Sequence, residues 1–151
     1  MGSVLGGHQR VTTRRLLIDT NSSGEPNSTQ VKIRSGIDTP EHLVGAAPAI
    51  AAQTVAGLRY GALGAGWGQR RLLQLDSLVH RAVVIPVDDI LIWTHARPRV
   101  ACRVAGHPLH DKAHAGDLWI AASAVAYGLP LVTDDGIFAG VPGLQVINEG
   151  P

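Results

Sequence analysis

Residues 116–138 read GDLWIAASAVAYGLPLVTDDGIF, and this stretch decides the fold class. Its first half carries apolar side chains at helical spacing and ends at Gly128, a residue typical of helix ends. Residues 130–133 then form a short apolar strand, which Asp134, Asp135 and Gly136 close as a turn. A helix that leads directly into a buried strand is the repeating unit of α/β proteins with parallel strands.

The same alternation extends in both directions from this stretch. Strands are predicted at residues 16–18, 46–53, 83–87, 130–133 and 144–147, and helices at residues 54–63, 67–79, 88–105 and 117–128. Pro98 should kink or split the third helix, because a proline removes a backbone donor and crowds the preceding turn. Residues 20–42 show no convincing period. We therefore predict an α/β fold with a mostly parallel sheet.

Length and composition exclude several classes of protein. The 151 residues fit one compact domain, which we place at residues 14–148 after a flexible leader of residues 1–13. The apolar fraction of 45% is enough for a core, and the net charge of +1 is too mild to indicate nucleic-acid binding by itself. Cys102 is the single cysteine, and neither a membrane span nor a secretory signal is evident. We expect a soluble cytoplasmic protein.

Three aspartates fall where a parallel sheet gathers its functional groups. Asp19 ends the first strand, Asp135 follows the fourth, and Asp117 begins the helix that leads into the fourth strand. Strand carboxyl ends and helix amino ends share one edge of such a sheet, and ligands bind there. Carboxylates brought together repel one another unless a cation compensates, and Mg²⁺ or Mn²⁺ prefers such oxygen ligands. An ion held there can activate water for phosphodiester hydrolysis.

Each aspartate also has an ordinary structural interpretation. Asp117 is favoured at a helix start by capping and by the helix dipole, and Asp135 by turn chemistry. Receiver-type phosphoacceptor domains and haloacid-dehalogenase-type phosphatases place aspartates at the same edge. The second class usually carries a further Asp two positions after the first strand's acid, where this chain has Asn21.

The ordered motifs of the chain resemble one family, the PIN-domain ribonucleases, and specifically the VapC-type toxins of bacterial type II toxin–antitoxin systems. The resemblance is carried by LLIDTN at residues 16–21, TVAGLRYGAL at 54–63, GDLWIAA at 116–122, GLPLVTDDGIF at 128–138 and VPGL at 141–144. It implies a three-layer α/β/α fold and a four-carboxylate Mg²⁺ site, with Mn²⁺ as an alternative ion. It also implies hydrolysis of RNA, neutralisation by a cognate antitoxin, and a homodimer.

The resemblance assigns roles to individual residues. Asp19 matches the first acid of the family, Asp117 the third and Asp135 the fourth, so these three would be catalytic and bind the metal. Asn21 and Thr133 match polar positions that orient the acids or contact phosphate. Two further candidates lie near the matched motifs: Asp134, with a turn role or a water-mediated contact to metal, and Arg59, a candidate for RNA binding.

The chain departs from the family at the second acid. The family pattern TVAELRYG has a glutamate where this chain has Gly57, and no glutamate occurs from residue 42 to residue 148. Losing that acid should weaken metal binding and reduce catalysis, commonly by about 10²–10³. An alternative is therefore a catalytically inactive PIN-fold module that binds antitoxin or RNA without cleaving. Residues 22–45 also lack the apolar helical pattern that helps relatives hold the antitoxin.

The remaining basic and aromatic residues allow weaker hypotheses. His107, His110 and His114 cluster before Asp117, but their loose spacing argues against a zinc site. The three tryptophans, Trp67, Trp93 and Trp119, are expected to be packing residues rather than platforms for base stacking.

Overall fold

A computed structural model describes residues 15–19 and 47–148 of the chain. The predicted leader, Asn21 and the segment without a period lie outside these residues. The strands are β1 (Arg15–Ile18), β2 (Ala47–Ala51), β3 (Val83–Ile85), β4 (Leu131–Val132) and β5 (Val146–Ile147). The α-helices are α2 (Ala52–Gly64), α3 (Gln69–Arg81), α4 (Asp89–Val104) and α5 (Ala115–Tyr127), with short 3-10 turns η2 (Pro108–His110), η3 (Lys112–His114) and η4 (Gly136–Phe138).

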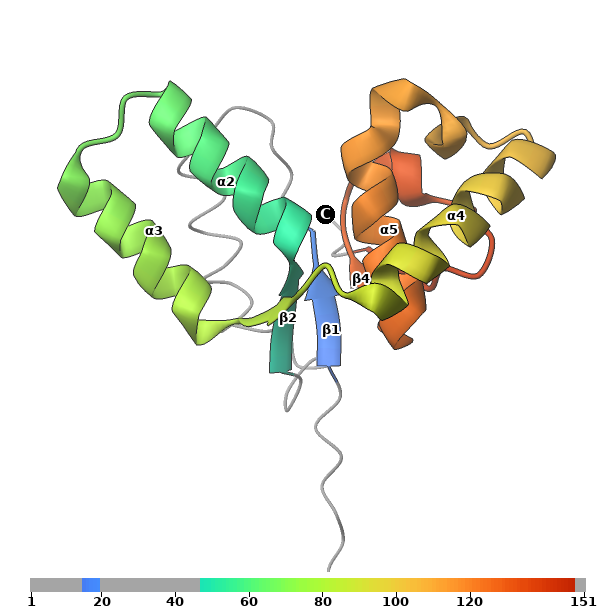
Figure 1. Ribbon diagram of the computed structural model, residues 1–151, viewed down its shortest axis with the longest axis horizontal. Helices are drawn as coiled ribbons and strands as arrows, with labels where there is room; N and C mark the ends of the chain where they lie inside the picture. The colour runs from blue at the N-terminus through green and yellow to red at the C-terminus, as the bar shows by residue number, and fades with distance from the viewer. Residues whose placement is uncertain (1–14, 20–46, 149–151) are drawn as a thin grey trace, which may run out of the picture.

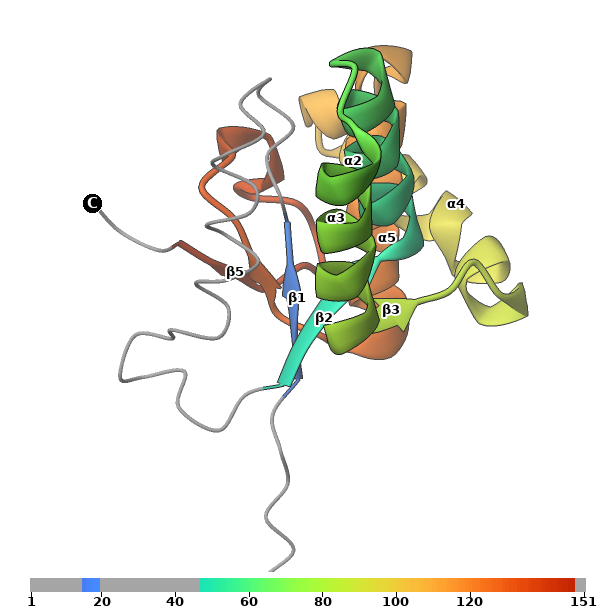
Figure 2. The ribbon, with the colours of Figure 1, turned by 90° about the vertical axis from the view of Figure 1, so that its left-hand side faces the viewer.

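The described strands form one sheet in the order β3-β2-β1-β4-β5, and every pairing is parallel. Helices α2 and α3 cover one face of this sheet and α4 and α5 cover the other (Figure 1). The view turned by 90° shows α2 and α3 in front of the strands and α5 behind them (Figure 2). The predicted α/β/α layering is therefore confirmed.

The main core lies between the sheet and α5. Leu17 and Leu131 are fully buried on the inner strands, and Leu118 and Ala121 of α5 pack against the same cluster. Helix α5 is rich in alanine, and its Ala121, Ala122 and Ala124 are buried, as is the large side chain of Phe138. None of the helices in the described residues is long and apolar enough to cross a membrane.

Helix α4 continues through Pro98, so of the two effects predicted for this proline, a kink or a split, the split is wrong. Pro98 is buried, and α4 packs along α5, which holds the helix together where one backbone hydrogen bond is missing. At the start of α4, the carboxylate of Asp88 accepts hydrogen bonds from the Leu91 N–H and from the Tyr127 hydroxyl of α5. The hydrogen bond from Tyr127 is the main cause of a lowered pKa of Asp88.

Two glycines are expected to respond to Ala substitution in opposite directions. Gly128 ends α5 with φ 61°, in the left-handed region, so Gly128→Ala should lower the free energy of unfolding by about 1–2 kcal/mol. Gly57 lies inside α2 with open space around an added Cβ, so Gly57→Ala should raise it by about 0.5–1 kcal/mol. Urea unfolding followed by circular dichroism measures both. Shifts of the same sign would contradict the helical geometry at one of the two positions.

Candidate active site at the carboxyl edge of the sheet

Two of the predicted acids are joined through one threonine. Asp19, directly after β1, is only 7% exposed, and its Oδ2 accepts a hydrogen bond of 2.8 Å from the Thr133 hydroxyl. The same Thr133 oxygen accepts the Asp135 N–H at 3.0 Å. Because β1 and β4 are neighbouring parallel strands, the residues that follow them emerge side by side. The structure thus links Asp19 and Asp135 in one hydrogen-bonded chain at the carboxyl edge.

Asp117 approaches the same edge from the opposite direction. It lies in the first turn of α5, and its Oδ2 is 3.2 Å from Nδ1 of His114, the residue that precedes this helix. The His114 ring therefore contacts one carboxylate oxygen, while Oδ1 accepts no hydrogen bond from any described residue. The i, i+3 spacing of His114 and Asp117 is the signal in the sequence that could have indicated this pair.

The first turn of α2 completes this edge of the sheet. An added Cβ at Gly116 would lie 3.6 Å from Nε2 of Gln53, so the beginnings of α2 and α5 meet next to Asp117. The hydroxyl of Thr54 is buried and has no hydrogen-bond partner among the described residues. A buried polar atom without a partner is costly, and a ligand or an ordered water at this edge would satisfy it.

Gly57 lies one helical turn beyond Gln53, on the same face of α2. A side chain there would lean toward the helix start, because Cα–Cβ bonds in a helix tilt toward its N-terminus. An added Cβ meets nothing within 4 Å. A side chain at position 57 would therefore begin without a clash and lean back toward the carboxyl edge.

The donors at this edge suit a hard divalent cation in type but are not gathered around one point. Carboxylate and hydroxyl oxygens are the ligands that Mg²⁺ and Mn²⁺ prefer. Asp135 Oδ1 accepts the Ile137 N–H at 3.0 Å as the cap of η4, which leaves Oδ2 without a partner among the described residues. Within residues 15–19 and 47–148, no three His, Cys, Asp or Glu side chains are placed to hold a metal together. Binding would thus require these side chains to rearrange around the ion.

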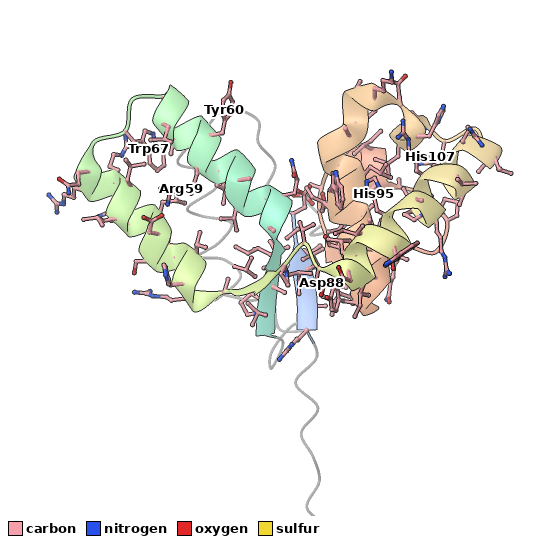
Figure 3. The ribbon with its side chains drawn as sticks, viewed as in Figure 1. Arg59, Tyr60, Trp67, Asp88, His95 and His107 are labelled. Carbon is pink, nitrogen blue, oxygen red and sulfur yellow. The ribbon has the colours of Figure 1, made fainter. Side chains whose placement is uncertain are left out.

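The other predicted site residues have different surroundings. Arg59 forms an ion pair with Asp76, so it joins α2 to α3, between which Figure 3 places it. This ion pair explains the presence of Arg59 without RNA, and its role in RNA binding stays a prediction. Asp134 is exposed and directly precedes Asp135 in the sequence.

The three clustered histidines do not share a ligand. His107 Nε2 donates to the Ala139 carbonyl at 2.8 Å, and His110 Nδ1 bonds the His107 carbonyl at 2.6 Å. His107 thereby ties the segment before α5 to the loop that follows Asp135 (Figure 3). The hydrogen bonds of His107 and His110 hold the segment before α5 in place, and no spacing in the sequence indicates them.

Trp119 packs behind the edge, as expected, and has a partner that sequence reasoning missed. Its ring stacks on His95 of α4 with ring centroids 3.9 Å apart. Burial is the main cause of a lowered pKa of His95, and the charge of Arg99 adds to it. A neutral His95 ring is the form that packs best between α4 and α5.

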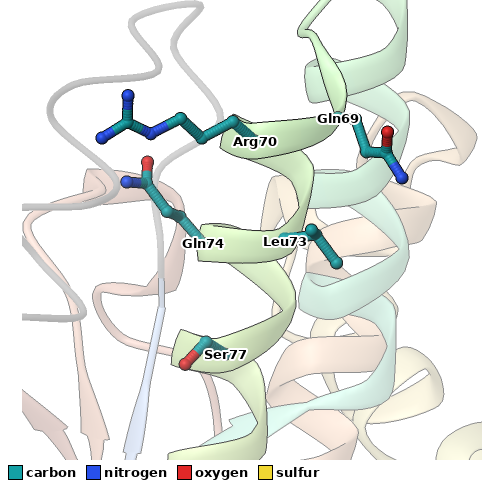
Figure 4. A pocket seen from close by; sticks show the side chains of 5 residues that line it. All are labelled: Gln69, Arg70, Leu73, Gln74 and Ser77. Carbon is teal, nitrogen blue, oxygen red and sulfur yellow. The ribbon is translucent and has the colours of Figure 1, made fainter.

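A shallow pocket on α3 lies away from the acids. Figure 4 shows its lining residues, Gln69, Arg70, Leu73, Gln74 and Ser77. All five come from one helix, and no acid of the carboxyl edge lines the pocket. It is therefore a feature of the outer surface of α3 rather than part of the candidate active site.

Comparison with solved structures shows which known proteins share this fold. The fold matches VapBC-1 from nontypeable Haemophilus influenzae with a TM-score of 0.68 and 20% identity, over 89% of this chain and 97% of that one. It matches DNA-bound VapBC from Salmonella typhimurium with a TM-score of 0.67 and 22% identity, over 89% and 98%. The chain therefore shares its fold with chains of these two VapBC structures.

Sequence comparison gives the family. Ribonuclease VapC5 of Mycobacterium tuberculosis (strain ATCC 25618 / H37Rv) is 33% identical over 123 residues, which cover 80% of this chain and 88% of that protein. No family model matches the sequence. The chain belongs to the VapC family of PIN-domain ribonucleases.

Proposed function

We propose that this chain is a divalent-metal-dependent endoribonuclease toxin that hydrolyses RNA phosphodiesters and is neutralised by a cognate antitoxin. The observation that carries the proposal is the chain from Asp19 through Thr133 to Asp135 at the carboxyl edge, with Asp117 at the start of α5. The ribonuclease name of the 33%-identical relative and the VapBC complexes among the structural neighbours support it. Because the proposed substrate is RNA, we expect the protein to act in the cytoplasm.

Each residue has a defined task in this proposal. Asp19, Asp117 and Asp135 would hold Mg²⁺ or Mn²⁺. An ion bound there would polarise the scissile phosphate and lower the pKa of the attacking water. Thr133 orients the Asp19 carboxylate through its hydroxyl and supports the backbone at Asp135. His114 holds one oxygen of Asp117, so the other oxygen faces outward from the pair.

The second candidate function is a module that binds antitoxin or RNA without cleaving. Gly57 favours it, because no described residue supplies a carboxylate in place of the family glutamate at this point of α2. In this alternative the fold and the three aspartates are retained, but the carboxyl edge binds the ion too weakly for turnover. Only a cleavage measurement separates the two candidates.

The change Gly57→Glu is expected to raise Mg²⁺-dependent RNA cleavage by about 10²–10³-fold. The physical reason is that position 57 lies one turn beyond Gln53, whose side chain is next to the start of α5, and that an added Cβ at position 57 meets no atom within 4 Å. The measurement compares both chains on total bacterial RNA, with Mg²⁺ and with the ion removed by a chelator. The matched control is Gly61→Glu, one turn further along α2 and equally open.

Three results are informative. Cleavage by the Gly57→Glu variant alone supports an impaired toxin, and cleavage by both chains shows that three aspartates suffice. Failure of both chains, with circular dichroism showing that they are folded, supports the binding module and contradicts the nuclease proposal. Equal gains from Gly57→Glu and Gly61→Glu would remove the special role of position 57.

A further inference from the structure

The start of α2 lies at the carboxyl edge, next to the first acid. The register of β1 with β2 pairs Leu17 with Ala49, so continuing it by two residues brings Asp19 level with Ala51, the residue that precedes α2. Figure 1 shows α2 leading off the end of β2 beside the tip of β1. Strands β2 and β4 flank β1, so the start of α2 and Asp135 lie on opposite sides of Asp19.

The first turn of α2 offers backbone N–H groups and carries no negative charge. The first N–H groups of a helix have no partner within it, and the helix dipole adds partial positive charge there. The N-cap residue Ala51 has no side chain that could accept them, and the first turn contains no acid. Gly57 adds none one turn further on. The start of α2 therefore favours an anion, whereas the aspartates beside it favour a cation.

Thr54 is an independent sign of a ligand at this helix start. The residue is only 6% exposed, and its hydroxyl has no hydrogen-bond partner among the described residues. It is the third residue of α2, and Cα–Cβ bonds in a helix tilt toward its N-terminus, so the side chain leans toward the same N–H groups. A buried hydroxyl without a partner costs free energy, and such costs are typical of sites built for a ligand.

We propose that the first turn of α2 binds a phosphate group of the RNA backbone. The N–H groups of Gln53 and Thr54 and the Thr54 hydroxyl donate to the phosphate oxygens, and we call these two residues the α2 subsite. Threonine has two accessible χ1 rotamers in a helix, and no described group holds this hydroxyl, so it can turn to the bound phosphate.

The α2 subsite complements the aspartates beside it. The side chain of Gln53 lies next to the start of α5, whose first turn carries Asp117, so the phosphate would be held at the border of the acidic group. A carboxylate at position 57 would place a negative charge near this phosphate, and Gly57 avoids that repulsion. The identity of the ligand rests on the proposed function, but both candidate functions require a grip on the RNA backbone, with or without cleavage.

Titration of inorganic phosphate into isotope-labelled protein, followed by NMR, tests the α2 subsite. The backbone amide signals of Gln53 and Thr54 should move with phosphate concentration, both with Mg²⁺ and with a chelator. The dinucleotide adenylyl-adenosine, which carries a backbone phosphate, should move the same signals. Adenosine, which has no phosphate, should leave them in place.

A charge placed in the first turn tests the contribution of the helix start. Gln53→Glu should weaken phosphate binding about 5–30-fold, because the carboxylate repels the anion and competes for the same N–H groups. The matched control is Gln69→Glu at the start of α3, which has the same length and likewise no side-chain cap and no acid in its first turn. This control should bind phosphate as the unchanged chain does.

A second pair of variants tests the hydroxyl. Thr54→Val keeps the shape of the side chain and should weaken phosphate binding about tenfold. Its urea midpoint should not fall, because the hydroxyl has no hydrogen bond to lose in the free protein. Thr54→Ser keeps the hydroxyl and should bind phosphate as the unchanged chain does.

Contrary results are distinguishable from failure of the nuclease proposal, since the titration needs no cleavage. Amide signals of α2 that do not move, equal weakening by Gln53→Glu and Gln69→Glu, or full binding by Thr54→Val overturns the α2 subsite. A lower urea midpoint in Thr54→Val assigns Thr54 to packing and removes it from the subsite. Binding of inorganic phosphate without binding of the dinucleotide overturns the assignment to RNA.

Discussion

Asp19→Asn is expected to lower Mg²⁺-dependent RNA cleavage about 10²–10³-fold and to leave the fold intact. The substitution is made in whichever chain cleaves RNA faster, the one with Gly57 or the Gly57→Glu variant. Asp19 is buried to 7% exposure, so its charge is held at the edge with little water to screen it. The amide has the same shape, and its oxygen can still accept the hydrogen bond from Thr133. The free energy of unfolding should therefore change by less than about 1 kcal/mol.

Two measurements separate a metal-binding role from a structural one. Calorimetric titration with Mn²⁺ should show binding to the unchanged chain and none to Asp19→Asn, independently of any RNA. The control is Asp111→Asn, since Asp111 caps η3 through the Ala113 N–H and asparagine caps equally well, so this turn should keep its shape. Retained Mn²⁺ binding and cleavage in Asp19→Asn would remove this residue from the proposed site.

The sequence predicted the layers and the edge because both depend on local pattern. The helix that ends at Gly128 and the strand that follows it lie within two residues of their predicted bounds. The parallel order of the strands then fixes that Asp19 and the residues after β4 emerge together. The proximity of these residues could therefore be predicted from the order and direction of the strands alone.

The contacts that tune the site depend on side-chain packing and could not be predicted in the same way. The link between His107 and Ala139 spans 32 residues, and no local period indicates it. Pro98 should interrupt a helix by its own chemistry, but packing of α4 on α5 keeps the helix whole. Trp93 has a large apolar side chain of the kind usually found in a core, and only the three-dimensional structure shows that it faces solvent.

Thr133→Val is expected to lower the free energy of unfolding by about 2–4 kcal/mol, although valine has almost the same shape as threonine. The Thr133 hydroxyl is buried, donates to Asp19 and accepts from the Asp135 N–H, so valine removes both hydrogen bonds at once. Losing one hydrogen bond at a buried group costs about 1–3 kcal/mol, and the half-buried Asp135 N–H falls at the low end of that range. Urea unfolding followed by circular dichroism gives the difference directly.

Thr133→Ser is the matched control, because it keeps the hydroxyl and loses only one methyl group, at a cost of about 0.8 kcal/mol. If the hydroxyl positions the acids, Thr133→Ser should bind Mn²⁺ as the unchanged chain does, and Thr133→Val should bind it about 10–100-fold more weakly. Equal loss of stability in both variants would assign the effect to packing of the methyl group. The Thr133 hydroxyl takes part in both hydrogen bonds, to Asp19 and from Asp135. Unchanged Mn²⁺ affinity in Thr133→Val would therefore show that Asp19 and Asp135 keep their positions without these hydrogen bonds.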